Sequence, residues 1–273
     1  MIETTRLADL HAKAQEVRRD IVTMVHRANS GHVGGSLSAA EIVVGLYHEV
    51  MRLDPANPRW AARDRFVLSK GHCTPVLYAV LAQRGYFPRA ELETFRRIGS
   101  NLQGHPYHPK TRGVDASTGT LGLGLSTACG MALAAKLQGA PHYTYVLCGD
   151  GEQQEGQIWE AAMFGRKYQL DHLIAFTDRN RLQTDGDTED VMPLDPLGDK
   201  WRAFGWHTQE IDGHDFREIL EAIAIAKRQA GKPAMIIANT IKGKGVSFME
   251  NEASWHGTPP DSGEHARALA ELA

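Results

Sequence analysis

An acidic residue and an amide-bearing residue follow two apolar segments, each at the point where the segment ends. Asp150 lies in GDGEQQEG (149–156), after the apolar run YTYVLC, and Asn180 ends DRN (178–180), after the run HLIAFT. If the two runs are neighbouring parallel strands, both side chains emerge at the carboxyl edge of one sheet, where open α/β sheets bind ligands. Carboxylate and amide oxygens, with a nearby backbone carbonyl, suit Mg²⁺ and leave coordination positions for phosphate oxygens.

The glycines beside Asp150 favour a bound anion. Gly149 and Gly151 allow a ligand to approach the backbone closely, and the start of the following predicted helix favours negative charge. The competing interpretation of this motif is a Gly-Asp-Gly turn with an unrelated asparagine further along the chain.

Histidines recur in turn-rich sequence beside glycine or proline. They are His32 in SGHVGG, His72 in SKGHCTP, His105 and His108 in QGHPYH, and His256 in SWHGTP. Imidazoles suit a site that binds phosphate or hydroxyl groups and moves protons near neutral pH. A single histidine in a turn is usually a solvated or hydrogen-bonded bystander, but several beside glycine or proline in separate loops favour a shared site. Their spacing lacks the pattern of a zinc site, and no cysteine pair supports one. By contrast, we expect His11, His26, His48 and His142 to be structural.

Two glycine-rich segments are further candidates. STGTLGLGLS (117–126) enters a predicted helix but is neither a dinucleotide fingerprint nor a P-loop, so it is also explained as a flexible helix entry. TIKGKG (240–245) follows the apolar run AMIIAN and places Lys242 where it can meet a phosphate, although a solvated lysine is the competing interpretation. The acidic stretch from Asp187 to Asp199 is predicted to be a solvated loop.

The elements that must position these residues alternate between strands and helices. We predict strands at 65–69, 143–148, 172–177, 206–211 and 234–239, and helices at 7–28, 75–84, 89–98, 125–137, 157–168 and 216–229, with a short one from Leu197. Ser38 and Glu41 predict a capping box that opens a helix reaching about Met51. The alternation predicts the α/β class, with a parallel sheet flanked by helices on both faces. We expect residues 1–273 to form one domain, with an irregular tail from about Gly243 that ends in a short helix.

Composition excludes several classes of protein. Hydrophobic residues make up 42% of the chain and the net charge is −3, so neither nucleic acid nor an anionic membrane is expected as a partner. No apolar run approaches the roughly 20 residues of a membrane span, and the polar start MIETTRLADLHAK lacks a signal-peptide core. The cysteines (Cys73, Cys129 and Cys148) are scattered and odd in number. They argue against a disulfide scaffold and favour a reducing, cytoplasmic location.

The motifs and their order resemble the N-terminal, diphosphate-binding domain of transketolase along essentially the whole chain. The series runs SGH, DRFVLSKGH, GHP, STGTLGLG, GDGEQQEG, DRNRL, AFGWH, IDGHD, TIKGKG and SWHG. The resemblance implies the thiamine diphosphate-binding fold, with thiamine diphosphate held through Mg²⁺ or Ca²⁺. It also implies an enzyme of the pentose phosphate type, which transfers a two-carbon ketol unit from a ketose phosphate to an aldose phosphate.

Carried over position by position, the resemblance implies three groups of site residues. The metal ligands would be Asp150, Asn180 and the backbone carbonyl of Leu182. The cofactor contacts would be His72, Gly119, Thr120, Leu121, Gly151, Glu155, Asn180, Lys242 and His256. His32, His105 and His256 would line the substrate channel and relay protons. Departures from the family pattern, such as SGHVGG for SGHPG, Leu123 for glutamine and Arg179 inside DRN, leave the metal and cofactor assignments standing and the sugars open.

The length of the chain implies a partner. Full-length members of the family carry two further domains, the first of which binds the aminopyrimidine ring and supplies an activating glutamate. Because 273 residues leave no room for either domain, the resemblance implies the first subunit of a split transketolase. Such a subunit would act only with a separate C-terminal subunit, in an α2β2 heterotetramer.

Two alternatives remain open from the sequence. One is the α-subunit of another thiamine diphosphate enzyme, such as a 2-oxo-acid dehydrogenase or an enzyme like deoxyxylulose-phosphate synthase. The other is a non-catalytic regulatory subunit that keeps the cofactor fold. The histidine set and SKGH favour transketolase over the first, because polyhydroxylated substrates need many polar contacts. The presence of Asp150, Asn180 and the histidines argues against the second, since a non-catalytic subunit has no need of all of them.

Overall fold

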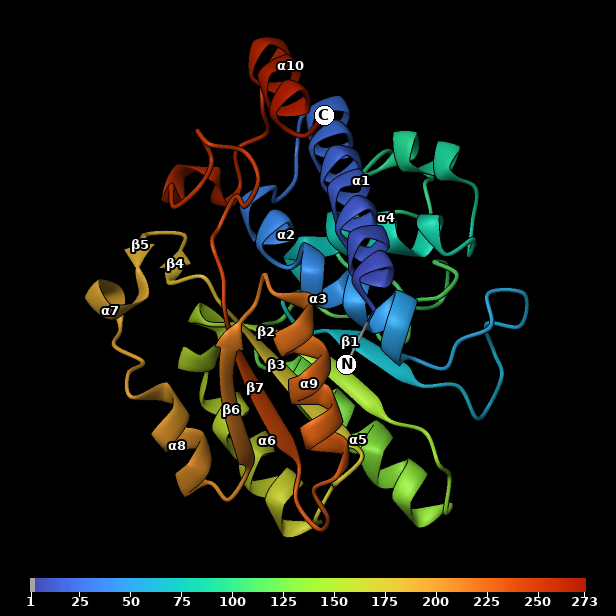
Figure 1. The fold of residues 1–273 in the computed structure, drawn as a ribbon, viewed down its shortest axis with the longest axis vertical. Helices are drawn as coiled ribbons and strands as arrows, with labels where there is room; N and C mark the ends of the chain where they lie inside the picture. The colour runs from blue at the N-terminus through green and yellow to red at the C-terminus, as the bar shows by residue number, and fades with distance from the viewer. Residues whose placement is uncertain (1–2) are drawn as a thin grey trace.

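The computed structural model describes residues 3–273, and a parallel sheet forms its centre (Figure 1). Within these residues the sheet has the order β1-β2-β3-β7-β6. The strands are β1 (Arg65–Leu68), β2 (Thr144–Gly149), β3 (Leu173–Arg179), β6 (His207–Asp212) and β7 (Ala234–Asn239). All four pairings between them are parallel, which confirms the predicted fold class.

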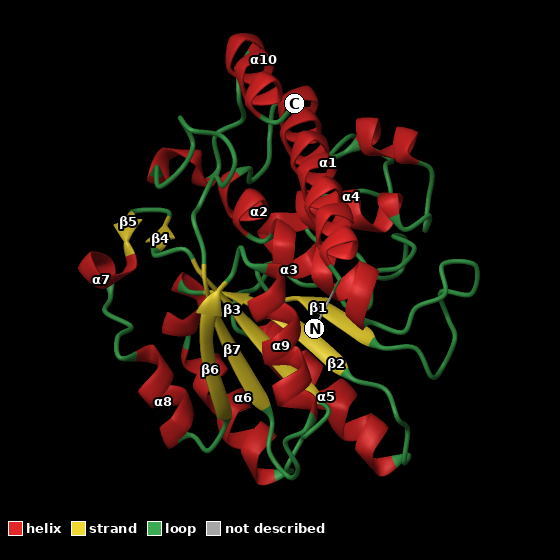
Figure 2. Cartoon of the chain, in the orientation of Figure 1, coloured by secondary structure: helices red, strands yellow, loops and turns green. Residues whose placement is uncertain are grey.

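Helices cover both faces of the sheet (Figure 2). One face packs on α5 (Leu123–Leu137), α6 (Gly156–Lys167) and α8 (Leu197–Ala203), and the other on α1 (Thr4–Ala28), α3 (Ala40–Gly45), α4 (Thr74–Gln83) and α9 (Phe216–Lys227). Successive strand residues alternate between the two cores, since Tyr145 belongs to one and Val146 to the other. The apolar runs are therefore continuous because both faces of the sheet are buried.

The order of the strands explains the division of the helices. The chain adds β2 and β3 in one direction, continues to the edge strand β6, and then returns to insert β7. Right-handed crossovers place helices on opposite faces when the direction of winding reverses. The crossover helices α5, α6 and α8 accordingly lie on one face, and α9, which precedes β7, lies on the other. The helix α4 also follows β1, but it packs with α1 and α3 on the α9 side.

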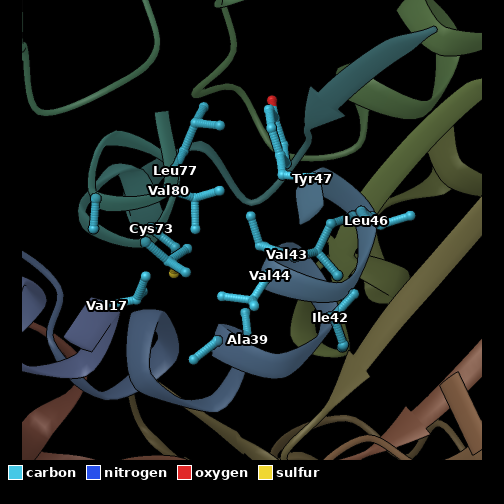
Figure 3. Close-up of a cluster of buried hydrophobic side chains, with 14 of the residues drawn as sticks. Val17, Ala39, Ile42, Val43, Val44, Leu46, Tyr47, Cys73, Leu77 and Val80 are labelled. Carbon is cyan, nitrogen blue, oxygen red and sulfur yellow. The ribbon is translucent and has the colours of Figure 1, made fainter. Parts of the chain in front are cut away.

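An N-terminal helical layer thickens one side of the molecule. It comprises α1, α2 (Gly34–Ser38), α3, a π-helical turn (Leu46–Val50), α4 and a 3₁₀ segment (Arg89–Thr94). Figure 3 shows Val17 of α1, Val43 of α3 and Val80 of α4 gathered in its apolar core. This layer supports the loops that run toward the carboxyl end of the sheet.

Short elements complete the described chain. They are the antiparallel hairpin of β4 (Leu182–Gln183) and β5 (Gly186–Asp187), α7 (Thr188–Val191), α10 (Ser262–Glu271), and 3₁₀ turns at Gly71–Cys73, Gly151–Gln154 and Ala253–His256. None of the helices over residues 3–273 has the length and apolar character needed to cross a membrane.

Two expectations about local structure are wrong. Ser38 ends α2 instead of capping the next helix, and its hydroxyl donates to Asp178 and to the Gly35 carbonyl. Glu41 forms no capping box, because its carboxylate is buried and accepts from Arg18 of α1. The helix expected at 89–98 is a 3₁₀ segment that ends at Thr94. For Ser38 and Glu41, tertiary partners that a local pattern does not contain decide the conformation.

Candidate functional site

A cavity of about 440 Å³ lies at the carboxyl ends of the central strands. The segments that follow β1, β2, β3 and β7 all contribute to its wall, as expected for a ligand site on an open α/β sheet. The predicted residues that line it are His32, His72, His105, Gly119, Leu121, Asp150, Gly151, Glu155, Asn180, Leu182, Lys242 and His256. Thr120 is absent from the lining and is exposed.

Asp150 and Asn180 come together because β2 and β3 are neighbours. Gly149 pairs in register with Asp178, so the residues that follow both strands emerge at the same edge. Asp150 is buried, and its carboxylate accepts from the backbone N–H groups of Gly151 and Arg181. Burial, with the nearby charge of Asp178, raises the pKa of Asp150 to about 6. A carboxylate in this position gains from a cation that binds to it.

Asn180 and Leu182 complete an oxygen-rich wall of the cavity. The Asn180 Oδ1 accepts from the Leu182 N–H at 3.1 Å, and both residues line the cavity beside Asp150. One carboxylate, one amide oxygen and one backbone carbonyl are hard donors of the kind that Mg²⁺ and Ca²⁺ take. Across residues 3–273 no group of three or more His, Cys, Asp or Glu side chains is arranged to hold a metal, and the predicted donor set does not depend on one.

Lys242 brings a buried cation to the same wall. Its Nζ donates to the Leu182 carbonyl at 2.9 Å and lies 2.8 Å from the Nδ1 of His256. Burial, and then the charge of Lys70, lowers the pKa of Lys242 to about 8. A protonated amine has no acceptor, so His256 presents Nδ1 as the acceptor and carries its proton on Nε2. An anion that enters the cavity meets a cation that little water screens.

Three histidines form a cluster inside the cavity. The ring centroids of His32, His72 and His256 are 5.0 to 5.4 Å apart. Burial, followed by neighbouring cationic groups, lowers the pKa of His32 and His72 to about 4 and that of His256 to about 3. At neutral pH these imidazoles are therefore uncharged, and each can offer one hydrogen-bond donor and one acceptor.

The remaining histidines of the turn-rich set differ in position. His105 lines the cavity, and its ring packs against Gly119. A Cβ atom added to Gly119 would lie only 3.1 Å from the His105 Cδ2, so the ring occupies the space that a side chain would need. Gly119 has a φ of +152°, which favours glycine and leaves the backbone bare at the cavity wall. His108 points elsewhere, because its Nδ1 contacts the Val114 carbonyl at 2.6 Å. His108 is thus a structural residue of the loop.

Three charged residues of the quoted motifs have contacts that sequence reasoning missed. Glu152 is buried and accepts from the Ser69 hydroxyl and from the N–H groups of Gly122 and Gly149. Lys70 and Asp178 form a buried ion pair. One sequence feature could have indicated these contacts. Each charged residue lies within an apolar or glycine-rich segment, where a side chain tends to be buried, and a buried charge requires a partner.

The acidic stretch is more than a solvated loop. Arg179 is 2% exposed, and its guanidinium donates to Glu189 at 2.8 Å and to Asp195 at 3.0 Å. A further bond joins it to the Thr188 hydroxyl. These contacts fix residues 188–195 against the end of β3, directly before Asn180 and Leu182. The stretch therefore anchors the chain that carries two of the predicted metal ligands.

Comparison with known proteins agrees with this geometry. Residues 11–272 match the family model described as transketolase, thiamine diphosphate binding domain. The chain is 51% identical to the 6-deoxy-6-sulfo-D-fructose transketolase subunit SqwG of Clostridium sp. (strain MSTE9), over 97% of the chain and 96% of that protein. It is 44% identical to one of the subunits of the apulose-4-phosphate transketolase of Phocaeicola vulgatus, over 96% of the chain and 93% of that protein.

Solved structures show the same likeness. The transketolase of Pichia stipitis in complex with sedoheptulose-7-phosphate superposes with a TM-score of 0.92 and 34% identity, over 97% of this chain. The match covers 40% of that longer chain. The transketolase of Leishmania mexicana superposes with a TM-score of 0.91, over 96% of this chain and 41% of its own. This chain thus spans about two fifths of the length of these solved proteins.

Proposed function

The chain belongs to the transketolase family by its thiamine diphosphate-binding domain, and from that premise we propose that it is the cofactor-binding subunit of a split transketolase. The reaction is transfer of a two-carbon ketol unit from a ketose phosphate, or a similar anionic ketose, to an aldose or aldose phosphate. The observation that carries the proposal is a single cavity that joins an oxygen-donor set, a buried lysine and a cluster of neutral histidines.

The oxygen-donor set is the proposed metal site. Asp150, the Asn180 side chain and the Leu182 carbonyl would hold Mg²⁺ or Ca²⁺. Lys242, Gly151, the backbone of residues 119–121, His72 and Glu155 would contact the cofactor, mostly near its diphosphate. When bound, thiamine diphosphate supplies the carbanion-stabilising chemistry by which the bond between the second and third carbons of the ketose is broken.

The histidines are the proposed sugar contacts. His32 and His256 are close enough to share one polyhydroxylated ligand, and His105 faces the same cavity. Because the pKa of each is lowered, each is neutral when substrate binds. A neutral imidazole can accept a hydroxyl proton at one nitrogen and donate a proton from the other. General acid–base catalysis needs both abilities, because hydroxyl protons are removed and returned over the two half-reactions.

A separate subunit is the proposed partner. The two relatives that are themselves subunits are covered along 93% or more of their own length, whereas the longer transketolase chains are covered along about two fifths. We therefore propose a C-terminal transketolase subunit, with pyrimidine-binding and third domains, that completes an α2β2 enzyme. The three cysteines are free and buried, which supports a cytoplasmic location for this chain. Neither nucleic acid nor a membrane is part of the proposal.

The names of relatives suggest the first donors to try. One is a transketolase for 6-deoxy-6-sulfo-D-fructose and another is for apulose 4-phosphate. The test mixes this chain with its partner subunit, thiamine diphosphate and Mg²⁺, and follows ketol transfer from these donors and from fructose 6-phosphate. Turnover by the mixture, with none by either chain alone, is expected. Release of CO₂ from a 2-oxo acid would favour the dehydrogenase alternative, and bound cofactor without any transfer would favour a regulatory subunit.

A further inference from the structure

Asp178 joins four segments beneath the cavity. Its side chain is completely buried, and its Oδ2 accepts from Lys70, from the Ser38 hydroxyl at 2.6 Å and from the Asn180 Nδ2 at 3.1 Å. Its Oδ1 accepts from the Thr240 hydroxyl. These four donors lie after β1, at the end of α2, after β3 and after β7. One carboxylate therefore ties together the loops that build the proposed cofactor site.

The contacts of Asp178 show that it is not itself a metal ligand. Both carboxylate oxygens are engaged by side-chain donors, one of which is the Lys70 ammonium. The residue has no exposed surface and does not line the cavity. Its effect on a bound ion must pass through neighbours that do line the cavity, and these are Asn180 and Lys70.

The contact with Asp178 decides which way the Asn180 amide faces. A carboxylate accepts hydrogen bonds and cannot donate them, so the atom of Asn180 nearest to Asp178 must be the NH₂ group. The amide oxygen is then turned to the other side, where it accepts from the Leu182 N–H. An amide without this carboxylate could rotate and present its NH₂ group, which repels a cation, to the metal.

Asp178 also balances the charge of Lys70. The Lys70 Nζ is buried and donates to Asp178 and to the Gly35 carbonyl at 2.8 Å. Lys242 already brings one cation to the cavity wall. Without Asp178, Lys70 would add a second, unpaired cation near the oxygen-donor set, and the field there would oppose a divalent metal.

We propose that Asp178 is a positioning residue, which turns the Asn180 oxygen toward the metal and neutralises Lys70, so that the metal site is formed before the cofactor binds. This inference rests on the proposed function. Residues that orient metal ligands in this way typically contribute about tenfold to a hundredfold to metal affinity.

The test uses Mn²⁺ in place of Mg²⁺ on the full chain, assembled with thiamine diphosphate and the partner subunit. Free Mn²⁺ is counted by electron paramagnetic resonance. Asp178→Asn should weaken Mn²⁺ binding by about tenfold or more, and excess Mn²⁺ should restore thiamine diphosphate binding. In an Asn180→Ala background the same substitution should have a smaller effect, since the amide that it orients is gone. Unchanged Mn²⁺ affinity in Asp178→Asn would overturn the inference. So would a double variant whose loss of Mn²⁺ affinity equals the product of the losses in the two single variants.

Asp64→Asn is the matched control. Asp64 is also a buried carboxylate and accepts from the backbone N–H groups of Arg52 and Tyr143, but it precedes β1 at the opposite edge of the sheet. This variant should keep the wild-type Mn²⁺ affinity even where its melting temperature falls. A loss of Mn²⁺ affinity equal to that of Asp178→Asn would show that any buried carboxylate has this effect, and would contradict a positioning role.

A milder variant covers the case in which Asp178→Asn does not fold. Thr240→Val removes one donor to Asp178 and leaves the carboxylate in place. It should weaken Mn²⁺ binding measurably, by less than Asp178→Asn, and wild-type affinity would then overturn the inference. Failure of the wild-type complex to bind thiamine diphosphate with Mn²⁺ would instead overturn the proposed function itself.

Discussion

At the scale of single residues, the cavity combines neutral imidazoles with a buried lysine. Lys242 and His256 are in contact, and burial lowers the pKa of both. The lysine would meet the diphosphate, while His256 stays uncharged and can donate a hydrogen bond from Nε2 to a hydroxyl group. This division of roles follows from placing both residues in the same poorly hydrated cavity.

Asp150→Ala should abolish metal-dependent binding of thiamine diphosphate. A hard divalent cation would lose the only carboxylate in its proposed donor set, and we expect the affinity to fall by about a hundredfold or more. Calorimetric titration of the assembled complex with thiamine diphosphate and Mg²⁺ measures this. Asp199→Ala, which changes an exposed aspartate on α8, is the control. Unchanged binding in Asp150→Ala would remove Asp150 from the metal site.

His105→Ala should reduce turnover more than cofactor affinity. His105 faces the cavity and is predicted to act on the sugar, so we expect kcat/KM to fall by about a hundredfold with thiamine diphosphate affinity near wild type. His108→Ala is a control from the same loop, since His108 contacts the Val114 carbonyl instead of the cavity. A loss confined to cofactor affinity would contradict the role given to His105.

At the scale of elements, a buried carboxylate joins the helical layer to the sheet. Glu41 of α3 accepts from Arg18 of α1 at 2.7 Å and contacts His214, in the turn between β6 and α9, at 2.9 Å. Burial alone would raise the pKa of Glu41, but the charge of Arg18 and the hydrogen bond from His214 outweigh it and lower the pKa below its ordinary value of 4.5. The ionised form is therefore the one that stabilises the fold.

Glu41→Gln should destabilise the chain by about 3 kcal/mol at pH 7, because Arg18 would keep a buried charge without its partner. The contribution of a carboxylate with a lowered pKa is complete above its unfolded pKa and is lost as pH falls through the folded one. The difference from wild type should thus shrink below pH 4.5. Urea unfolding at pH 7 and at pH 4 measures it, with Glu49→Gln, in the part-exposed pair with Arg6, as the control. A difference that does not change with pH would contradict this explanation.

The sequence predicted elements well where burial pattern decides them, and poorly where distant partners do. The four strands β1, β2, β3 and β7 are largely buried and have continuous apolar runs, so their predicted ends lie within two residues of the observed ones. The edge strand β6 is polar and partly exposed, and its predicted ends are equally close. Ser38 and Glu41 fit a helix-start pattern, but their side chains bond to Asp178 and Arg18 across the fold. No local pattern contains those partners.

The same limit applies to the site. Asp150, Asn180 and the histidines could be predicted because they follow strands or stand beside glycine, where side chains reach a ligand. Lys70, Glu152 and Asp178 lie in the same motifs, but their roles depend on contacts between loops far apart in sequence. The resemblance assigns Thr120 together with its neighbours Gly119 and Leu121, but the Thr120 side chain is exposed and does not line the cavity.

At the scale of the whole molecule, we propose that this chain forms one part of an active site. Its cavity holds the proposed metal and diphosphate contacts, and the proposed partner supplies the surface that covers the rest of the cofactor. Matches along nearly the full length of relatives that are subunits, and along two fifths of longer transketolase chains, support this division. Cofactor binding and catalysis should therefore depend on a divalent metal and on assembly.

The most direct test is a calorimetric titration of thiamine diphosphate into the chain assembled with its partner subunit, in Mg²⁺ and again in EDTA. We predict one thiamine diphosphate for each copy of this chain in Mg²⁺ and loss of that binding in EDTA. Binding of equal affinity in EDTA, or no binding in either buffer, would contradict the proposal that this chain holds the cofactor through a divalent metal.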